Sequence, residues 1–512
     1  MRALKIFLLI FILQITIASQ ESGWFSQYGG TTNVFLCVFA TDPDNAWIGT
    51  QEDGIILRTT DGGEHWNQII IDPNKRVASI YFINQNIGWC ISSDFTTPDI
   101  YKTIDGGLTW VKKFSDNIDL SSIYFINENI GWAVGHSYTS GRPGRVVKST
   151  DGGENWKSTY TFEINDYPED VCFLNEEKGF IVGQAVLPGK IFKSTDGGFN
   201  WNEKNIPTSL DNISFADSLH GIAVGGPYVV RTADGGESWE ELFSGIEDIQ
   251  SVSNRYPLSW MTAYPYILYT TDFGEKLFPQ YKTDGYFHDV FFVNDTVGWA
   301  VGGFGRILKT INGGRSNVGY PHIPNLLLPA NGETANLPVY FEWHEISYSA
   351  AQLQVSSDSL FLDTVINIRI IPNYFHSYEL NSYSKYFWRV RSENINGYSE
   401  WSQIRYFYTG ITKIDDDKNT IVMFSLIQNY PNPFNPSTKI SWQAPVSGWQ
   451  TLKVYDVLGN EVATLVDEYR NAGSYEVEFK STAGSRQLAN GVYFYQLKAG
   501  DYLETKKMIL LK

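Results

Sequence analysis

The sequence predicts an all-β protein, with a seven-bladed β-propeller followed by two small β-sandwich domains. Aromatic residues make up 15% of the 512 residues and glycine is abundant at 45, as is typical of short strands joined by tight turns. A turn motif recurs at intervals that suit propeller blades, and the segments after the repeats alternate apolar and polar residues as sandwich strands do.

The repeat is a turn motif in which Asp-Gly-Gly is followed by tryptophan three residues after the second glycine. Five copies are intact, and two degraded copies begin at Thr270 and Thr310. The period of about 40 residues and the apolar segments between copies suit seven four-stranded blades. The motif residues are Asp61 and Trp66, Asp105 and Trp110, Asp151 and Trp156, Asp196 and Trp201, and Asp234 and Trp239.

We interpret this motif as structural. An aspartate can accept backbone N–H groups across a tight turn, glycine adopts positive φ at little cost, and tryptophan buries a large apolar surface. The seventh copy lacks a tryptophan strand, whereas an unassigned strand, Gly23–Ser26, precedes the first blade. We therefore predict that Trp24 pairs near Ile307–Thr310 and closes the ring, which removes an open sheet edge.

These repeats resemble the Asp-box, or BNR, repeats of sialidases, the sortilin ectodomain and the Ycf48-like photosystem assembly factors. The strands with the sequence GWAVG are most similar to the Ycf48-like group. The resemblance covers about residues 23–318, inside a propeller domain that we expect to span 20–318. It implies a fold and no particular activity, because one repeat serves enzymes, receptors and assembly factors.

Recognition is expected on the face opposite the Asp-Gly-Gly turns, where the loops between second and third strands vary most in length. Three of these loops, at 92–99, 136–145 and 184–190, are expected to gather beside one sector of the ring mouth. One hypothesis is an anionic or carbohydrate ligand held by Arg142 and Arg145, and the alternative is that these are ordinary solvated loops. The candidate residues are Asp94, Asp99, His136, Tyr138, Arg142, Arg145 and Lys190.

We find no catalytic motif in the sequence and expect no cofactor. It contains no HExxH, no GxSxG elbow and no P-loop. The Arg-Ile-Pro element of sialidases is absent, because Arg369–Pro372 carries an extra residue. A glycoside hydrolase needs two opposed carboxylates, for which Asp53, Asp94 and Asp99 are candidates that the sequence cannot pair.

The net charge, the cysteines and the N-terminal segment indicate which partners, metals and membrane segments to expect. A formal net charge of −17 disfavours binding to nucleic acid. The three cysteines, Cys37, Cys90 and Cys172, lie in apolar strands and fit neither a disulfide framework nor a zinc site, so we expect no metal. Residues 1–19 are typical of a secretory signal peptide, and we expect no transmembrane segment in the mature chain.

Residues 319–410 alternate as sandwich strands, and Leu380 followed by Tyr386 matches the spacing of a tyrosine corner. This segment resembles a fibronectin type III domain, which implies a spacer more often than a binding module. Residues 411–423 are expected to form a linker, in which the acidic run 415–417 is solvated.

Residues 424–512 begin with a proline-rich entry segment and continue as alternating strands. They resemble the type A C-terminal sorting domain of the type IX secretion system of Bacteroidetes-like bacteria. The resemblance implies the type IX secretion machinery as partner, tail removal near 415–420, and attachment to surface lipopolysaccharide or release. The residues that carry it are Tyr430, Pro431, Asn432, Pro433, Phe434, Asp456, Gly459, Gly491 and Tyr493.

The sequence thus predicts an exported protein, secreted or held on the outer-membrane surface, whose propeller is a non-catalytic platform for binding or adhesion to a glycan or protein. The alternatives are a secreted glycoside hydrolase, sialidase-like or glucanase-like, on the same ring, and an extracytoplasmic assembly factor. An aromatic or basic rim favours recognition, whereas carboxylates facing each other across the mouth favour a hydrolase.

Overall fold

The computed structural model is nearly all β, and its chain divides into two compact units, residues 1–412 and 413–512. The predicted signal peptide and residues 413–423 of the predicted linker lie outside the described residues. Strand β37 continues to Thr412, two residues beyond the predicted end of the first sandwich at residue 410. The structure describes residues 23–95, 97–115, 117, 119–136, 143–164, 166–185, 189–244, 246, 248–315, 319–412, 425–444, 448–471, 473–480, 488–499 and 502–511.

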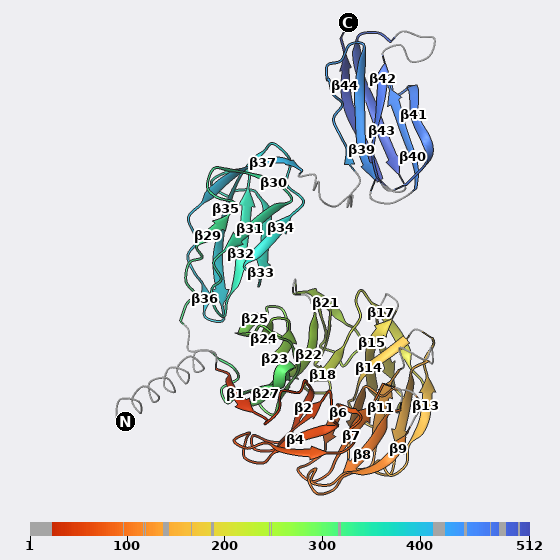
Figure 1. Cartoon of the computed structure of the whole chain (residues 1–512), viewed down its shortest axis with the longest axis vertical. Coiled ribbons are helices and arrows are strands. Elements are labelled where there is room, and N and C mark those ends of the chain that lie inside the picture. Colours follow the sequence, from red (N-terminus) through yellow and green to blue (C-terminus); the bar gives the residue numbers. More distant parts are fainter. Residues whose placement is uncertain are drawn as a thin grey trace, which may run out of the picture. The chain divides into compact units, whose positions relative to one another are not determined.

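Seven four-stranded antiparallel sheets can be traced among the described residues of the first unit, arranged as blades around a ring (Figure 1). The first strands of successive blades contact each other and close the ring. Blade one is β2 (Phe35–Ala40), β3 (Ala46–Thr50), β4 (Ile55–Thr59) and β5 (Asn67–Ile70). Blade two is β6 (Arg76–Phe82), β7 (Gly88–Ser93), β8 (Asp99–Thr103) and β9 (Val111–Ser115). Blade three is β10 (Ser122–Phe125), β11 (Gly131–Gly135), β12 (Arg145–Ser149) and β13 (Lys157–Thr161).

The remaining blades follow the same plan. Blade four is β14 (Asp166–Phe173), β15 (Gly179–Ala185), β16 (Gly189–Ser194) and β17 (Asn202–Ile206). Blade five is β18 (Asn212–Phe215), β19 (Gly221–Gly225), β20 (Tyr228–Thr232) and β21 (Glu240–Phe243). Blade six is β22 (Ile249–Arg255), β23 (Leu258–Ala263), β24 (Tyr266–Thr270) and β25 (Phe278–Lys282). Blade seven is β26 (Phe287–Phe292), β27 (Gly298–Gly302) and β28 (Arg306–Thr310), with a 3-10 turn, η1 (Gly303–Gly305), and it is completed by β1 (Phe25–Tyr28).

The ring is closed by its N-terminal strand. β1 pairs antiparallel with β28, so that Phe25 lies opposite Lys309 and Tyr28 opposite Arg306. Trp24 is buried in the core that blades six and seven share, and its Nε1 donates a hydrogen bond to Gln280 Oε1 at 3.2 Å. The predicted closure is confirmed, and it covers what would otherwise be the free edge of blade seven.

Each Asp-Gly-Gly turn is held by local hydrogen bonds. Asp61 Oδ1 accepts the backbone N–H of His65 at 3.0 Å and the hydroxyl of Thr59 at 2.8 Å. The bond from the His65 backbone lowers the pKa of Asp61 to about 2, so the carboxylate is charged at neutral pH. Gly62 and Gly63 have φ of 72° and 87°, which glycine adopts without strain. Asp105, Asp151, Asp196 and Asp234 accept the same backbone bond in their own turns.

Four pairs of neighbouring blades are joined directly by a tryptophan of the second strand. Trp89 Nε1 on blade two donates to the carbonyl oxygen of Gly152, in the Asp-Gly-Gly turn of blade three, at 3.0 Å. Its ring stacks on Phe125 with centroids 3.5 Å apart. Trp47, Trp132 and Trp260 make the equivalent bonds to Gly106, Gly197 and Gly313 of the following blades. Each tryptophan therefore satisfies a carbonyl and packs against the next blade at once.

The joint between blades seven and one is relayed through the closing strand. Trp299 Nε1 donates to Gln27 Oε1 at 3.3 Å, and Gln27 Nε2 donates to the carbonyl of Gly62 in blade one at 2.8 Å. Lys309 Nζ donates to the same carbonyl at 2.8 Å. The last joint thus uses the same acceptor position as the four direct tryptophan joints.

A small β-sandwich follows the propeller within the first unit. Its Tyr386 hydroxyl accepts the backbone N–H of Asn381 at 3.1 Å, the contact expected of a tyrosine corner. Glu393 is buried and accepts hydrogen bonds from Arg369 and from Lys276 of blade six. One sheet is β29 (Leu326–Leu328), β31 (Val339–Trp343) and β34 (Tyr374–Ser377), and the other is β30 (Glu333–Leu337), β37 (Arg405–Thr412), β35 (Lys385–Asn394), β32 (Ala350–Ser356) and β33 (Thr364–Ile370), with β36 (Gly397–Tyr398) on β35.

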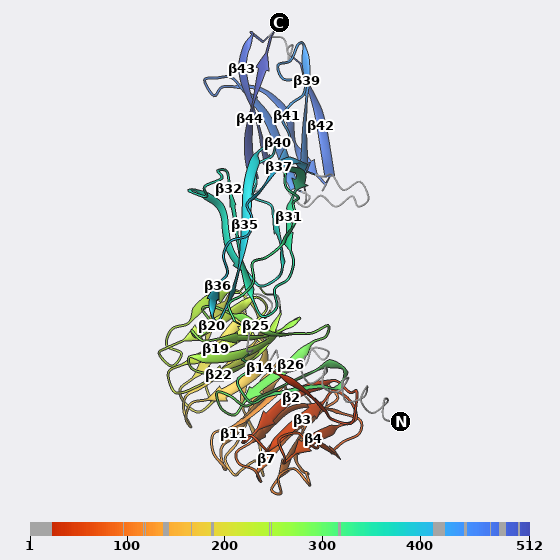
Figure 2. The ribbon, with the colours of Figure 1, turned by 90° about the vertical axis from the view of Figure 1, so that its left-hand side faces the viewer.

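The second unit is another β-sandwich, whose two sheets can be followed in Figure 2. Phe434 of the entry segment is 1% exposed in its core, whereas Tyr430 is 80% exposed. Asp456 accepts backbone N–H groups of Leu458 and Asn460 in a turn where Gly459 has φ of 82°. One sheet is β38 (Ser425–Leu426), β39 (Ser437–Ala444) and β42 (Gly473–Lys480), and the other is β41 (Glu461–Arg470), β40 (Gly448–Tyr455), β43 (Gly491–Ala499) and β44 (Tyr502–Leu510).

The joint between blades two and three predicts the effect of Trp89→Phe. The substitution keeps most of the aromatic packing and leaves the buried Gly152 carbonyl without its donor, so the free energy of unfolding should fall by about 2 kcal/mol or more. Denaturant unfolding of the chain measures this loss.

The matched control is Trp66→Phe, because the indole N–H of Trp66 has no hydrogen-bond partner among the described residues. This variant should lose clearly less stability than Trp89→Phe. Equal losses would contradict a role for the indole hydrogen bond in joining the blades.

Candidate functional site

The channel of the ring opens into a pocket of about 430 Å³. Most lining residues lie near the starts of the first strands of the blades, and Phe95 and His136 come from loops between second and third strands. The pocket therefore lies on the face opposite the Asp-Gly-Gly turns, where recognition was expected. We call it the channel mouth. Its charged residues and histidines are Arg76, Asp119, His136, Glu169, Asp170, Asp211, His288 and Asp289.

Two carboxylates of the channel mouth connect neighbouring blades. Asp170 of blade four accepts the Ser122 hydroxyl of blade three at 2.6 Å and the backbone N–H of Ile213 in blade five at 2.9 Å. Asp289 of blade seven accepts the Ser251 hydroxyl of blade six at 2.6 Å and the backbone N–H of Val38 in blade one at 2.8 Å. Both oxygens of each carboxylate are thus used in holding the inner strands together.

Burial sets the protonation of these groups. It raises the pKa of Asp170 to about 6 and that of Asp289 above its usual range, against the opposing effect of their hydrogen bonds. It also raises the pKa of Asp211 to about 6. The same desolvation lowers the pKa of His136 and of His288, which favours neutral imidazoles at the channel mouth.

Arg76 contributes positive charge to the pocket and is held in place. Its Nη2 donates to Asp119 Oδ2 at 2.8 Å, and its guanidinium carbon lies 4.0 Å from the centroid of the Phe95 ring. Phe95 remains 51% exposed and has a φ of 70°, an unusual backbone angle for a bulky residue. A strained residue that presents an aromatic ring beside a pocket is typical of a binding surface.

More aromatic side chains are exposed on the same face at blades six and seven. Tyr264 and Tyr286 stack with centroids 4.5 Å apart and are 45% and 47% exposed. Phe304, in the 3-10 turn of blade seven, is 79% exposed with a φ of 59°. Together with Phe95 these residues form what we call the aromatic rim.

The structure disperses the predicted rim residues over different environments. His136 is 2% exposed in the channel mouth, where Nδ1 lies 3.2 Å from the carbonyl oxygen of Pro168. Asp94 is exposed and accepts the backbone N–H of Thr97, while Arg145 begins strand β12. Tyr138 and Arg142 lie outside the described residues, so the paired-arginine hypothesis stays a prediction.

Two other predicted rim residues form internal salt bridges. Asp99 is 2% exposed and lies 2.7 Å from Lys75 Nζ and 3.0 Å from Lys112 Nζ. Lys190 lies 2.8 Å from both Asp166 and Glu203. These salt bridges engage the charges of Asp99 and Lys190 within blades two and four.

The sequence reasoning missed the inter-blade carboxylates and the aromatic rim. A signal for the carboxylates exists, because aligning the first strands places a small or polar residue one position before a buried aliphatic residue in every blade. The rim carries no such signal. Its residues come from turns of different length, and only the closed ring brings them to one face.

No group of three or more His, Cys, Asp or Glu that could hold a metal ion occurs among the described residues. Within the same residues, no helix is long and apolar enough to cross a membrane. Cys37, Cys90 and Cys172 are unpaired, and burial raises the pKa of each thiol.

Two family models match separate parts of the chain. Residues 64–161 and 158–243 match the model described as photosynthesis system II assembly factor YCF48, and residues 428–511 match a secretion system C-terminal sorting domain. The photosystem II assembly lipoprotein Ycf48 of Synechococcus sp. (strain CC9902) is 28% identical over 130 residues, 25% of this chain. The chain spans only 37% of the length of that relative.

Three solved structures are similar to slightly more than half of this chain. YCF48 bound to D1 peptide is 18% identical, with a TM-score of 0.47 over 57% of this chain and 95% of that one. YCF48 from Cyanidioschyzon merolae is 17% identical, with a TM-score of 0.47 over 56% and 98% of the two chains. A streptogramin B lyase is 14% identical, with a TM-score of 0.46 over 56% and 96%.

The raised pKa of Asp170 predicts how stability varies with pH. A carboxyl whose pKa is raised by folding stabilises the fold below its unfolded pKa, near 4, and loses that contribution as pH rises through about 6. Asp170→Asn removes this titration. The free energy of unfolding of the parent relative to the variant should therefore fall by up to about 3 kcal/mol between pH 4 and pH 7.5.

Chemical denaturation at a series of pH values measures this difference. Asp94→Asn, which removes an exposed carboxylate, is the control and should give a much flatter curve. If the difference in the free energy of unfolding between the parent and Asp170→Asn does not change with pH, then burial does not raise the pKa of Asp170.

Proposed function

We propose that this secreted propeller protein, which carries Ycf48-like repeats and a C-terminal sorting domain, recognises an extracellular glycan with its channel-mouth face and has no catalytic role. The observation that carries the proposal is that the aromatic side chains and the carboxylates of this face have different roles. The exposed side chains of the rim are aromatic, whereas Asp170 and Asp289 are only partly exposed and are hydrogen-bonded to neighbouring blades. Stacked, partly exposed tyrosines offer flat surfaces on which sugar rings pack, with a polar hydroxyl beside each.

A glycoside hydrolase is the second candidate. Asp170 and Asp289 lie in one pocket, and a raised pKa is a property of a general acid. Against this candidate, a catalytic carboxylate must present an oxygen to the substrate, and here both oxygens of each carboxylate accept hydrogen bonds from the blades. Recognition is therefore the better-supported function.

An assembly role is the third candidate, and it rests on the Ycf48-like repeats of residues 64–243. Such a factor would bind a polypeptide at the same face. The sorting domain supports secretion or display at the cell surface, and we propose that the tail is removed during passage and the protein is then anchored on the outer membrane or released.

The recognition proposal predicts a rim-dependent interaction on a glycan array. The exported chain should bind selected glycans without releasing products. The double variant Tyr264→Ala/Tyr286→Ala should bind at least tenfold more weakly, because aromatic side chains that a ligand covers at the centre of an interface contribute about 2 kcal/mol or more to the binding free energy.

Tyr378→Ala, which removes a 66% exposed tyrosine of the first sandwich, is the control and should leave binding unchanged. Product release from any bound glycan would favour the hydrolase instead. If the double variant binds as the parent does, the aromatic rim is not the glycan-binding surface.

The sorting domain gives a separate prediction about export. In a bacterium that has a type IX secretion system, deletion of residues 424–512 should leave the propeller in the periplasm, because the tail is the signal for passage across the outer membrane. Fractionation and immunoblotting measure this distribution. Appearance of the truncated chain at the surface or in the medium would contradict the assigned role of the tail.

A further inference from the structure

Blade six departs from the repeat at the hairpin between its first two strands. In blades two, three, four, five and seven an aromatic residue at the end of the first strand faces a glycine at the start of the second, as in Phe82 opposite Gly88. Blade six has Asn254 opposite Ser259 instead, and its turn is shortened to Tyr256-Pro257. Arg255 occupies the position that is apolar in those blades, where the residues are Ile83, Ile126, Leu174, Ala216 and Val293.

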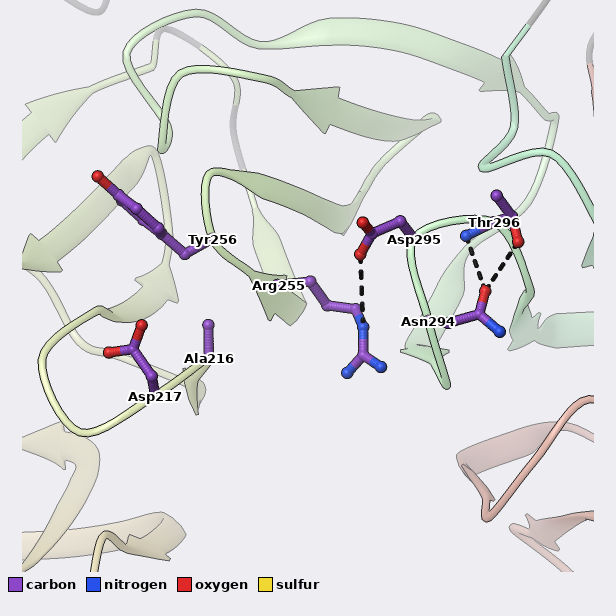
Figure 3. Close-up of a pocket in the computed structure, with 7 residues that line it drawn as sticks. All are labelled: Ala216, Asp217, Arg255, Tyr256, Asn294, Asp295 and Thr296. Atoms are coloured by element: carbon purple, nitrogen blue, oxygen red, sulfur yellow. Dashed lines mark hydrogen bonds and ion pairs between the residues drawn. The ribbon is translucent and has the colours of Figure 1, made fainter.

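The shortened hairpin leaves a cleft of about 470 Å³ on the face that carries the Asp-Gly-Gly turns. Figure 3 shows Arg255 between Asp217 of blade five and Asp295 of blade seven, with Tyr256 on the same side as Asp217. The cleft is thus lined by the hairpin in which blade six departs from the repeat.

A second departure in blade six supports the same location. Its turn reads Asp-Phe-Gly, and Phe273 has a φ of 58°, where the intact repeats have glycine. The Phe273 ring lies 5.0 Å from that of Tyr256, edge to face. Beyond Tyr256 lies a second hollow of about 450 Å³, lined in part by Phe273 and Arg231. Tyr256 thus forms a ridge between two hollows.

The ridge presents aromatic surface to solvent. Tyr256 is 44% exposed, and its ring is backed by His220, which stacks on it with centroids 3.6 Å apart. His220 is in turn fixed by Asp217, whose Oδ2 lies 2.9 Å from Nδ1. A supported ring with one exposed side can pack against the apolar face of a flat ligand.

The cleft beside the ridge mixes donors and acceptors. The side chain of Arg255 is 33% exposed, and its Nη2 donates to the carbonyl of Val293. Asp295, 65% exposed, lies 3.9 Å from Arg255 Nε. Asn294 uses Oδ1 to accept the N–H and hydroxyl of Thr296, which directs the acceptor inward and leaves the amide N–H groups as donors.

We propose that this surface of blade six, built on Arg255 and Tyr256, is a binding cleft for a neutral saccharide. A sugar hydroxyl both donates and accepts, so it suits closely interspersed cationic, carboxylate and amide groups. The carboxylates of Asp217 and Asp295 oppose an anionic ligand, and Arg255 opposes a cation. A peptide would need an open strand edge or an apolar pocket, and the described lining of this cleft supplies neither.

This cleft is separate from the channel mouth, because hairpin turns of the inner strands line it whereas strand starts line the mouth. Its occupation does not depend on the function proposed for the mouth. If both bind glycans, the rigid ring presents two sites on opposite faces, which raises the avidity for a polymeric or surface-bound glycan.

The test uses the full exported chain on an array of neutral oligosaccharides, with sulfated and uronic-acid counterparts. Arg255→Ile restores the apolar residue of the other repeats, and Tyr256→Ala removes the ridge. Each should weaken binding to the neutral saccharides at least tenfold. Glu128→Ala, on the equivalent exposed turn of blade three, is the matched control and should bind as the parent does. Thermal unfolding of Arg255→Ile, with a midpoint close to that of the parent, establishes that the fold is intact.

The rim variant Tyr264→Ala/Tyr286→Ala separates this proposal from the function of the mouth. Loss of binding in the cleft variants alone supports the cleft and contradicts the mouth, and loss in the rim variant alone does the reverse. Partial losses in both sets support two sites. Unchanged binding in both cleft variants, or a preference for the acidic saccharides that needs Arg255, overturns the proposal of a neutral-saccharide cleft.

Discussion

The ring depends most on one hydrogen bond that recurs at four of its joints, from the indole N–H of a second-strand tryptophan to the first glycine carbonyl of the next blade's Asp-Gly-Gly or Asn-Gly-Gly turn. That carbonyl is buried at the contact between blades, and without a donor it would be costly to desolvate. The Asp side chain shapes the turn so that the carbonyl points at the neighbouring blade. The two halves of the repeat, the tryptophan strand and the Asp-Gly-Gly turn, are therefore complementary parts of one joint.

Because the residues of this joint are used in holding the blades together, candidate binding sites are expected where a blade departs from the repeat. Where the repeat is intact, its residues are used in joining blades, and the inner carboxylates Asp170 and Asp289 serve the same purpose around the channel. Exposed side chains that could bind a ligand are found where a blade departs from the repeat, in turns whose length varies or whose motif is degraded. Phe95 and Phe304 of the aromatic rim, and Phe273 beside the blade-six cleft, all have positive φ angles that bulky residues rarely adopt. Strain of this kind persists where the surrounding structure enforces it.

The fold could be predicted from the sequence because its determinants are local and periodic. The spacing of the Asp-Gly-Gly turns indicates the blades, and the absence of a tryptophan strand after Asn312 indicates that Trp24 closes the ring. The site could be predicted only as a face. Asp99 and Lys190 lie at loop ends, and their sequence neighbours gave no sign of Lys75 or Asp166, because those partners precede or begin the first strands of blades two and four. Tyr264 and Tyr286 are likewise brought together only by the closure of adjacent blades.

The central claim is that ligands bind where the blades depart from the repeat, on a ring that itself does not move. Hydrogen–deuterium exchange of the exported chain, with and without a saturating glycan identified on the array, tests it directly. We expect added protection at 254–256 and 294–296, or at 264 and 286, with unchanged exchange in the intact Asp-Gly-Gly turns of blades one to three. Protection centred on those intact turns, or spread evenly over all blades, would contradict it.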